Sequence, residues 1–352
     1  MILFLFMSAV LWLVGIAMKA PKKDRWIMIG GLFGLIMLSH LVLPESHAVR
    51  QAFGGSFAHW VLMGMFAVLA VIYARWVQGL KARRQPNVVT SVEETVAAPA
   101  PLFAAGELDR YARHIVLHDI GGPGQKALKE ARVLVVGAGG LGSPALMYLA
   151  ASGVGTIEIV DDDVVELSNL QRQVIHSEDA QGQAKVTSAA ARIGQVNSHC
   201  DVITHEMRLD DRSADALISG VDIVLDGCDN FKTRYLVNEI CTNLGKPLIS
   251  GALSQWEGQV SVFDPAHGTP CYKCVFPEAP MGDNAPTCAT TGVLSPLPGV
   301  VGAMMAAETV KVITGAGQAL RGEMLIYDAK YAETRKIRLQ KGFDCPVCGP
   351  KS

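Results

Sequence analysis

The glycine-rich segment from Val135 to Gly142 constrains the fold more than any other feature. It reads VVGAGGLG, ends an apolar strand-like run and precedes a helical run that starts near Pro144. Glycine allows a tight turn and close backbone approach, and a helix N-terminus offers free N–H groups to a phosphate. The segment therefore predicts a buried strand, a phosphate-binding turn and a helix. The turn glycines are Gly137, Gly139, Gly140 and Gly142.

Strand-like and helical runs alternate through the rest of this region. The strand-like runs are Val133–Val136, Ile157–Val160, Ile223–Leu225 and Pro247–Ser250, and the helical runs include Pro144–Ala151 and Ala184–Ile193. Alternation of this kind is typical of a doubly wound, mainly parallel α/β sheet of the Rossmann type. We expect that fold class for the region.

Asp161 stands at the end of the second strand-like run, where a carboxylate receives ribose hydroxyls in dinucleotide-binding folds. NAD, FAD and ATP enzymes share this much of the pattern. Two cations then follow closely, Arg172 in SNLQRQ and Lys185 in GQAK. A triphosphate needs such cations, whereas the pyrophosphate of NAD is held largely by backbone groups. The cations favour ATP, and an NAD-dependent oxidoreductase stays the alternative.

The N-terminal region is far more apolar than the remainder. Three nearly uncharged runs, Met1–Met18, Trp26–Leu43 and Phe57–Tyr73, each have about the length of a membrane-spanning helix. A signal peptide for the first run and buried core helices for the others are the alternatives. Cleavage is not expected, because the chain lacks a basic n-region and a small-residue cleavage site. We expect three transmembrane helices.

Charge sets the expected orientation and excludes one class of partner. Up to Gln85 there are nine Lys and Arg against two Asp and Glu, and totals of 31 and 33 leave the remainder with a net charge of −9. Basic residues between the first two runs and after the third place everything beyond about Arg84 in the cytoplasm. The acidic remainder offers no basic face for nucleic acid. We predict a multi-pass inner-membrane protein with a membrane segment at 1–84, a flexible linker at 85–106 and a cytoplasmic domain at 107–352.

Eight cysteines all follow the membrane segment, in a compartment where structural disulfides are rare. Four form two pairs, CYKC and CPVC, and two CxxC turns can complete a tetrahedral zinc site with no position left for water. We therefore expect a structural zinc ion. A thioredoxin-like redox pair is the alternative, disfavoured because neither CxxC is predicted to open a helix after a strand. The four predicted ligands are Cys271, Cys274, Cys345 and Cys348, and the cysteines expected to be small buried residues are Cys200, Cys228 and Cys241.

Four motifs together resemble the MoeB/ThiF/HesA adenylyltransferases, relatives of ubiquitin-activating enzymes. They are RYARHIVL, the stretch Asp161–Gln173, GQAK and LDGCDNFKTR, and the resemblance covers roughly Leu108 to Pro350. It implies ATP-dependent adenylylation of the C-terminal Gly-Gly carboxylate of a ubiquitin-like sulfur carrier, of the molybdopterin or thiamine type, with release of pyrophosphate. Family members also carry the four-cysteine site.

The resemblance also implies roles for individual residues. Asp161 would hold the ribose, Asp229 would place Mg²⁺ near the reacting phosphate, and Arg113 would enter the partner subunit's site in a homodimer. The other expected nucleotide contacts are Ser168, Asn169, Leu170, Gln171, Arg172, Lys185 and Asn230. Asp229 and Asn230 also suit the N-cap of a helix beginning near Phe231.

The resemblance leaves two interpretations open for Cys288. Some relatives use a cysteine here in acyl or persulfide transfer, but Thr290 and Thr291 stand where many relatives have an acidic residue. Without a rhodanese domain after CPVCGPKS, sulfur would come from a separate protein. A non-catalytic, membrane-bound nucleotide-binding platform is the second alternative to the adenylyltransferase.

Overall fold

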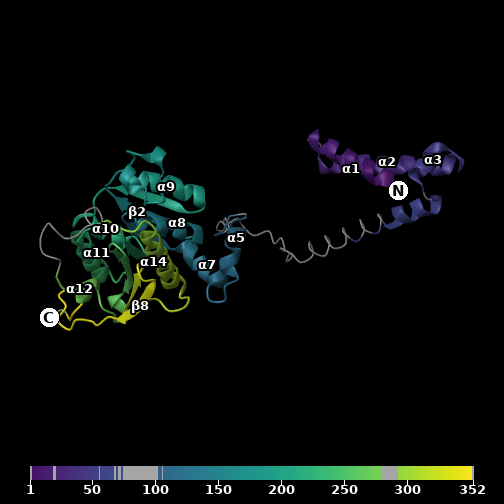
Figure 1. The fold of residues 1–352 in the computed structure, drawn as a ribbon. Helices are drawn as coiled ribbons and strands as arrows, with labels where there is room; N and C mark the ends of the chain where they lie inside the picture. Colours follow the sequence, from purple (N-terminus) through teal and green to yellow (C-terminus); the bar gives the residue numbers. More distant parts are fainter. Residues whose placement is uncertain are drawn as a thin grey trace, which may run out of the picture. The chain divides into compact units, whose positions relative to one another are not determined.

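The computed structural model describes residues 2–18, 21–54, 56–66, 69, 73, 102–104, 106–278 and 292–350. The chain divides into two compact units, Met1–Ala98 and Pro99–Ser352. Both are drawn in Figure 1, with sequence position shown by colour. Each unit has its own packing and is described separately.

The described part of the first unit consists of helices whose aromatic side chains meet around Trp60. Its helices are α1 (Ile2–Ala17), α2 (Lys22–Val42), α3 (Ala48–Phe53) and a further apolar helix at Phe57–Phe66. The Trp60 ring lies 5.6 Å from Phe4, 5.9 Å from Phe33 and 5.7 Å from His40, centroid to centroid. Trp60 is 1% exposed, so these rings form the interior of the unit.

Among the described residues, two helices are long and apolar enough to cross a membrane, Lys23–Val42 and Leu297–Thr314. Leu297–Thr314 belongs to the second unit, where its buried residues are part of the core. Leu3–Ile16 and Phe57–Phe66 are apolar but shorter. The third predicted span extends past residue 66 and lies partly outside the described residues. Three transmembrane helices therefore stay a prediction.

The second unit is built on one sheet of eight strands in the order β3-β2-β1-β4-β5-β6-β7-β8. The strands from β3 through β5 run parallel, and β6, β7 and β8 continue the sheet in antiparallel fashion. Their bounds are β1 Arg132–Val136, β2 Thr156–Asp161, β3 Asp201–Glu206, β4 Ile223–Asp226, β5 Leu248–Leu253, β6 Glu257–Phe263, β7 Glu323–Asp328 and β8 Glu333–Arg338.

Helices cover both faces of this sheet, as Figure 1 shows. Alternate residues of β1 reach the two cores, because successive side chains of a strand point to opposite faces: Val133 and Val135 belong to one core, Leu134 and Val136 to the other. The first core includes residues of α7 (Gly121–Glu130), α8 (Gly142–Ser152), α9 (Lys185–Val196) and α14 (Leu297–Thr314). The second includes residues of α10 (Ala214–Ser219), α11 (Phe231–Leu244) and α12 (Tyr272–Val275).

The doubly wound α/β prediction is confirmed for the parallel half of the sheet. All four predicted strands and both predicted helices are present, with bounds that differ by at most a few residues. Two features were not predicted: the strand β3 and the antiparallel extension β6–β8. The sheet is therefore parallel over five of its eight strands and mixed as a whole.

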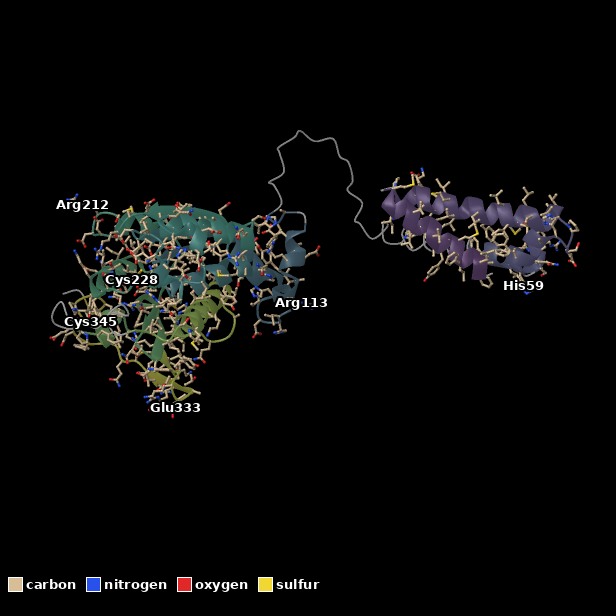
Figure 2. All side chains as sticks on the ribbon, turned by 45° about the horizontal axis from the view of Figure 1, so that its top comes forward. His59, Arg113, Arg212, Cys228, Glu333 and Cys345 are labelled. Carbon is tan, nitrogen blue, oxygen red and sulfur yellow. The ribbon has the colours of Figure 1, made fainter. Side chains whose placement is uncertain are left out.

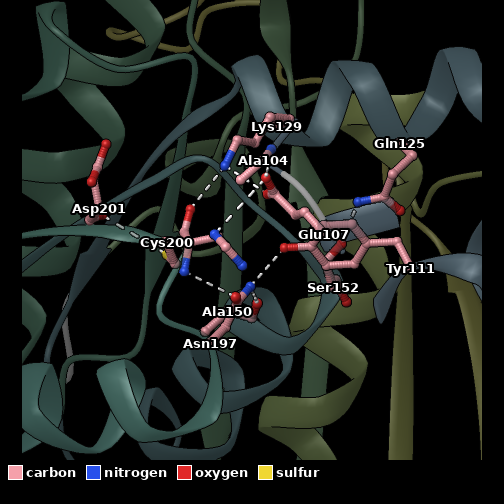
Figure 3. A network of polar contacts seen from close by, with 11 residues as sticks. Ala104, Glu107, Tyr111, Gln125, Lys129, Ala150, Ser152, Asn197, Cys200 and Asp201 are labelled. Atoms are coloured by element: carbon pink, nitrogen blue, oxygen red, sulfur yellow. Dashed lines mark hydrogen bonds and ion pairs between the residues drawn. The ribbon is translucent and has the colours of Figure 1, made fainter. Parts of the chain in front are cut away.

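A buried polar network holds the first residues of the second unit against its body (Figure 3). Glu107 is 1% exposed, forms a 2.7 Å ion pair with Lys129 and accepts the Ala104 N–H at 2.8 Å. Asn197 donates to the Tyr111 hydroxyl at 2.8 Å. Burial acts to raise the pKa of Glu107, but the Lys129 ammonium and the Ala104 N–H outweigh it and lower the pKa. The short helices α5 (Glu107–Arg110) and α6 (Ala112–Ile115) are fixed in this way.

Candidate functional site

A cavity of about 910 Å³ opens at the carboxyl edge of the parallel strands. It lies beyond the ends of β1, β2, β3 and β4. The chain passes from β1 to β2 and β3 on one side, and then crosses from β3 to β4 on the other side of β1. In open α/β sheets this switch point is where ligands bind. Nine of the predicted site residues line it: Gly137, Gly139, Gly140, Asp161, Asn169, Arg172, Lys185, Asp229 and Asn230.

The glycine turn forms the floor of the cavity beside the N-terminus of α8. Gly137 has φ of 95°, in the left-handed region that favours glycine, and a Cβ there would lie 3.2 Å from the Gly227 carbonyl oxygen. A Cβ on Gly142 would stand 1.9 Å from the Gly137 carbonyl oxygen. Gly137 therefore serves the turn, and Gly142 lets the helix start directly against it.

Asp161 joins the turn to the end of β2. Its Oδ2 accepts the Ala138 N–H at 2.7 Å, and its Oδ1 accepts the Asp163 N–H at 2.8 Å. Burial raises the pKa of Asp161, and the two N–H groups together with the nearby Lys185 charge oppose the rise. A carboxylate oxygen has more than one lone pair, so each can also accept a hydroxyl from a sugar.

Arg172 and Lys185 bring two positive charges to the same cavity. The Arg172 guanidinium contacts Asn169 Oδ1 at 3.2 Å and the Ser168 carbonyl oxygen at 3.3 Å. Lys185, the first residue of α9, is 4% exposed and pairs with Asp163 at 2.7 Å. The Asp163 side chain is 66% exposed, so a buried ammonium is held at the cavity wall by a solvated carboxylate that an anionic ligand can replace.

Asp229 and Asn230 follow β4 and have different roles. Asn230 is the N-cap of α11, and its Oδ1 accepts the Thr233 N–H at 2.9 Å, so the predicted cap is confirmed. Asp229 is exposed at the cavity, and its carboxylate bonds to no residue in the part of the chain that the structure describes. Its oxygens are therefore free to bind a cation.

A buried ion pair at the cavity, between Asp226 and the lining residue Arg234, was missed by sequence reasoning. Asp226 ends β4 at 1% exposure, accepts the Ser250 hydroxyl at 3.0 Å and lies 3.3 Å from the Arg234 guanidinium. Burial acts to lower the pKa of Arg234, but Asp226 outweighs it and the pKa is raised. Burial, reinforced by Asp226, raises the pKa of Cys228. The only sequence signal for this pair was the position of Asp226 at the end of a strand-like run. The metal-binding role was assigned to the neighbouring Asp229 instead.

The other predicted site residues lie elsewhere. Ser168, Leu170 and Gln171 belong to the same loop as Arg172 but do not line the cavity, and Gly142 lies behind the turn. Arg113 is exposed on α6, on the opposite side of the unit from Cys345 in the view of Figure 2. Cys288, with Thr290 and Thr291, lies outside the described residues.

The two cysteine pairs, far apart in sequence, meet in space. The four sulfurs lie within 4.8 Å of one another, at 3.9 Å for Cys271–Cys274, 3.7 Å for Cys271–Cys345 and 3.3 Å for Cys274–Cys348. Four thiolates around a zinc ion at ~2.3 Å would stand about 3.8 Å apart. The cluster thus has nearly the dimensions of a tetrahedral metal site, and its distances exclude a disulfide bond.

The prediction that neither CxxC opens a helix after a strand was partly wrong. Cys271 is the N-cap of the one-turn helix α12, so the first CxxC does open a helix, although the 3₁₀ turn Pro265–His267 separates it from β6. The convergence of both pairs is stronger evidence than the local motif. The remaining prediction for cysteines holds in part: Cys200 and Cys241 are buried, and Cys228 is half-buried at the cavity.

Fold and cavity together define an α/β protein with a ligand-binding site at the switch point of its sheet. Residues 111–347 match the ThiF family. The chain belongs to that family.

Relatives of known function agree with this membership. The chain is similar to the SAMP-activating enzyme E1 of Haloferax volcanii, 49% identical over 245 residues that cover 70% of this chain and 90% of that protein. It is 47% identical over 247 residues to the sulfur carrier protein adenylyltransferase of Thermus thermophilus, covering 69% and 91%. It is 42% identical to the adenylyltransferase and sulfurtransferase MOCS3 of Mus musculus over 282 residues, which span 80% of this chain and 61% of that longer protein.

Solved structures show the same architecture. The chain superposes on E. coli MccB crystallised with ATP with a TM-score of 0.61 and 25% identity, over 68% of this chain and 75% of that one. The mainly parallel α/β fold is thus shared with an enzyme that has been crystallised with a nucleoside triphosphate.

Proposed function

We propose that this chain adenylylates the C-terminal carboxylate of a ubiquitin-like sulfur-carrier protein with ATP and releases pyrophosphate. It is a nucleotidyltransferase of the ThiF family. The observation that carries the proposal is the meeting of Arg172, Lys185 and Asp229 around the glycine turn in one cavity. Two cations and a free carboxylate suit a triphosphate with its metal ion, and exceed what a pyrophosphate held by backbone requires.

The reaction needs charge stabilisation more than proton transfer. A carboxylate oxygen of the carrier bonds to the α-phosphorus of ATP, and the bond from that phosphorus to the bridging oxygen breaks, with its electron pair leaving on pyrophosphate. The carboxylate is already ionised at neutral pH, so no general base is required. Arg172 and Lys185 would neutralise the phosphate oxygens, and the glycine-turn N–H groups would hold them.

Asp229 would hold Mg²⁺, since its carboxylate is exposed at the cavity and unpaired among the described residues. Oxygen ligands and phosphates suit this ion, which when bound supplies positive charge to the phosphates. Asp229→Asn should therefore raise the magnesium concentration that half-saturates the reaction.

The cysteine cluster would hold one structural zinc ion. Its four sulfurs are spaced as tetrahedral coordination requires, and the cluster ties the last described residues of the chain to α12. With four thiolate ligands the ion would have no open position for a substrate. Its contribution would be to stability alone.

The membrane segment, linker and catalytic domain keep the bounds 1–84, 85–106 and 107–352 in this proposal. Three transmembrane helices would place the catalytic domain at the cytoplasmic face of the inner membrane, where ATP is available. A reporter active only outside the cytoplasm, fused after Arg84, should be silent. Activity of the reporter there, or release of the protein from membranes by alkaline carbonate, would contradict this part.

A homodimer would bring the exposed Arg113 of each subunit to the other's cavity. Arg113 does not line the cavity of its own subunit. Mixing two inactive variants, Arg113→Ala and Lys185→Ala, should restore activity, because one mixed site in the heterodimer has both residues intact. No recovery after subunit exchange would contradict the shared site. A role for Cys288 in transfer and a separate sulfur-donor protein also stay predictions.

The test of the main proposal is carrier-dependent exchange of labelled pyrophosphate into ATP by the full-length protein in detergent. Molybdopterin-type and thiamine-type carriers are compared side by side, each with a matched carrier whose terminal Gly-Gly is deleted. We expect exchange with one intact carrier and none with its truncated form. Absence of exchange with both carrier types would refute the activity, and tight NAD binding insensitive to Arg172→Ala would favour an oxidoreductase.

A further inference from the structure

The peptide group between Ala138 and Gly139 is held in an unusual way at the centre of the glycine turn. The preceding N–H, that of Ala138, donates to Asp161 Oδ2 at 2.7 Å. The Ala138 carbonyl oxygen lies 3.0 Å from His176 Nε2. A turn residue that approaches a phosphate is thus clamped on both sides by side chains from other segments.

The Ala138 carbonyl fixes the direction of one N–H group. In a trans peptide the C=O of one residue and the N–H of the next lie in one plane and point in opposite directions. The C=O of Ala138 points at His176, so the N–H of Gly139 points away from it. Gly139 lines the large cavity, whereas His176 lines a second cavity of about 390 Å³. The Gly139 N–H finds no hydrogen-bond partner among the described residues.

The partners of His176 determine its tautomer. A carbonyl oxygen can only accept, so Nε2 carries the proton and donates to Ala138. Nδ1 then accepts the hydroxyl proton of Ser188, 2.9 Å away. Burial, together with the nearby Lys185 charge, lowers the pKa of His176 and favours this neutral form. Both groups are buried, at 8% exposure for His176 and 6% for Ser188.

Ser188 connects this arrangement to the second phosphate-binding element. It lies on α9 one turn after Lys185, the buried cation of the cavity wall. The chain of contacts from Ser188 through His176 to Ala138 therefore links the helix that supplies the ammonium to the turn that supplies the N–H. A buried hydrogen-bonded chain of this kind fixes the relative position of the elements it joins.

We propose that His176 is a positioning residue that aims the Gly139 N–H at a phosphate of bound nucleotide and sets the spacing between the glycine turn and Lys185. This inference rests on the proposed nucleotide site but not on the carrier or on the transfer step. His176 touches neither substrate nor reacting atoms; it acts through the Ala138 peptide.

The test measures nucleotide binding to the full-length protein without carrier, by competition with a fluorescent ATP analogue. His176→Phe keeps an aromatic ring and loses the donor, so we expect the Kd for ATP to rise about tenfold. The affinity for adenosine should stay within about twofold, because adenosine has no phosphate to contact the turn. His176→Gln restores an N–H donor and should bring the Kd for ATP back to within about threefold of the unmodified protein.

Asn197→Leu is the matched control. Asn197 is also buried and donates to Tyr111 and to the Ala150 carbonyl oxygen, but it does not line the cavity. It should lower Tm without selective loss of ATP binding. If His176→Phe does not fold, Ser188→Ala takes its place, with an expected rise of about twofold to threefold in the Kd for ATP. An unchanged Kd, equal loss of ATP and adenosine affinity, or no recovery in His176→Gln would overturn the inference.

Failure of this inference is distinguishable from failure of the proposed function. A protein that binds ATP with the expected His176 dependence but exchanges no pyrophosphate would retain the positioning role and lose the adenylyltransferase assignment. A protein that exchanges pyrophosphate with normal ATP affinity in His176→Phe would do the reverse.

Discussion

The glycine-turn cavity and the cysteine cluster lie in one unit but are built in opposite ways. The cavity gathers charged groups that face open space, with Asp229 unpaired among the described residues and Lys185 held by a solvated carboxylate. The cluster gathers four sulfurs that face one another, with no comparable volume between them. The difference indicates that the cavity leaves its charged groups available to a ligand, whereas the cysteine cluster connects parts of the chain to one another.

The largest expected effect would come from opening the cysteine cluster. Cys348→Ser should lower the content of the proposed zinc ion well below one per chain, because serine is a poor ligand for zinc beside three thiolates. Tm should fall by about 10–20 °C, since structural zinc sites contribute several kcal/mol or more to folding. Metal analysis and thermal unfolding measure both.

Cys241→Ala is the control for the cysteine cluster, because Cys241 is buried outside it. It should keep its metal and lose only a few degrees. A Cys348→Ser protein with unchanged Tm would show that the cluster does not hold the fold.

The buried ion pair between Asp226 and Arg234 tests whether residues that stabilise the fold can be told apart from residues that bind a ligand. Arg234→Met would leave Asp226 charged and buried without its partner, which costs about 3–5 kcal/mol. We expect Tm to fall by roughly 10 °C and activity to fall with it, in thermal unfolding and exchange assays. Arg335→Met removes an exposed pair at 3.8 Å from Glu257 and should change Tm by less than a degree or two. Equal changes of Tm in Arg234→Met and Arg335→Met would contradict the larger contribution assigned to the buried pair.

Removal of a cation from the cavity should lower the activity strongly and change Tm little. Lys185→Met keeps the length of the side chain and deletes the charge, so exchange of pyrophosphate should fall about 10²–10³-fold. Tm should change little, because the lost partner Asp163 is largely exposed. Lys126→Met, on the exposed face of α7, is the matched control and should retain full activity. A parallel loss of Tm and activity in Lys185→Met would assign the lysine to the fold instead.

The smallest expected effect is on the pH dependence of stability. The pKa of His176 is lowered from 6.5 in the folded state, so its contribution is present above that pH and is lost as pH falls through the folded pKa. Below pH 6.5 unfolding should become easier, by at most about 1.4 kcal/mol per pH unit for this group. Tm measured from pH 7.5 to 5.0 should decline less steeply in His176→Phe. An identical slope in both proteins would contradict the assignment.

The parallel half of the sheet was predictable because its signals are local. Buried central strands such as β1 and β4 are continuous apolar runs, and glycine and acidic residues mark their carboxyl ends. The edge strands lack such signals. Four of the six residues of β3 are exposed, and all of β8 is exposed, so neither has the apolar run or alternation that identifies a strand. Their assignment depends on pairing with neighbours rather than on composition.

The site residues also fall into those that local motifs predict and those that only the structure shows. Asp161, Arg172 and Lys185 could be proposed from motifs, because each stands at a fixed place after the glycine turn. His176 could not, since a buried polar residue is explained by the partner that satisfies it, and its partner Ala138 comes from another segment. Distant partners also explain why the convergence of the CxxC pairs was only an expectation until their sulfurs were placed.

The cysteine cluster has a consequence for the order of events during synthesis. Cys345 follows its partner Cys271 by 74 residues, which at ordinary ribosomal rates of about 5–20 residues per second is a delay of about 4–15 s. Throughout that interval the nascent chain carries two thiols of an unfinished site, after the glycine turn and the parallel strands have already emerged. The cavity at the glycine turn can therefore assemble first, and loading of the proposed zinc ion would be the late step that closes the domain.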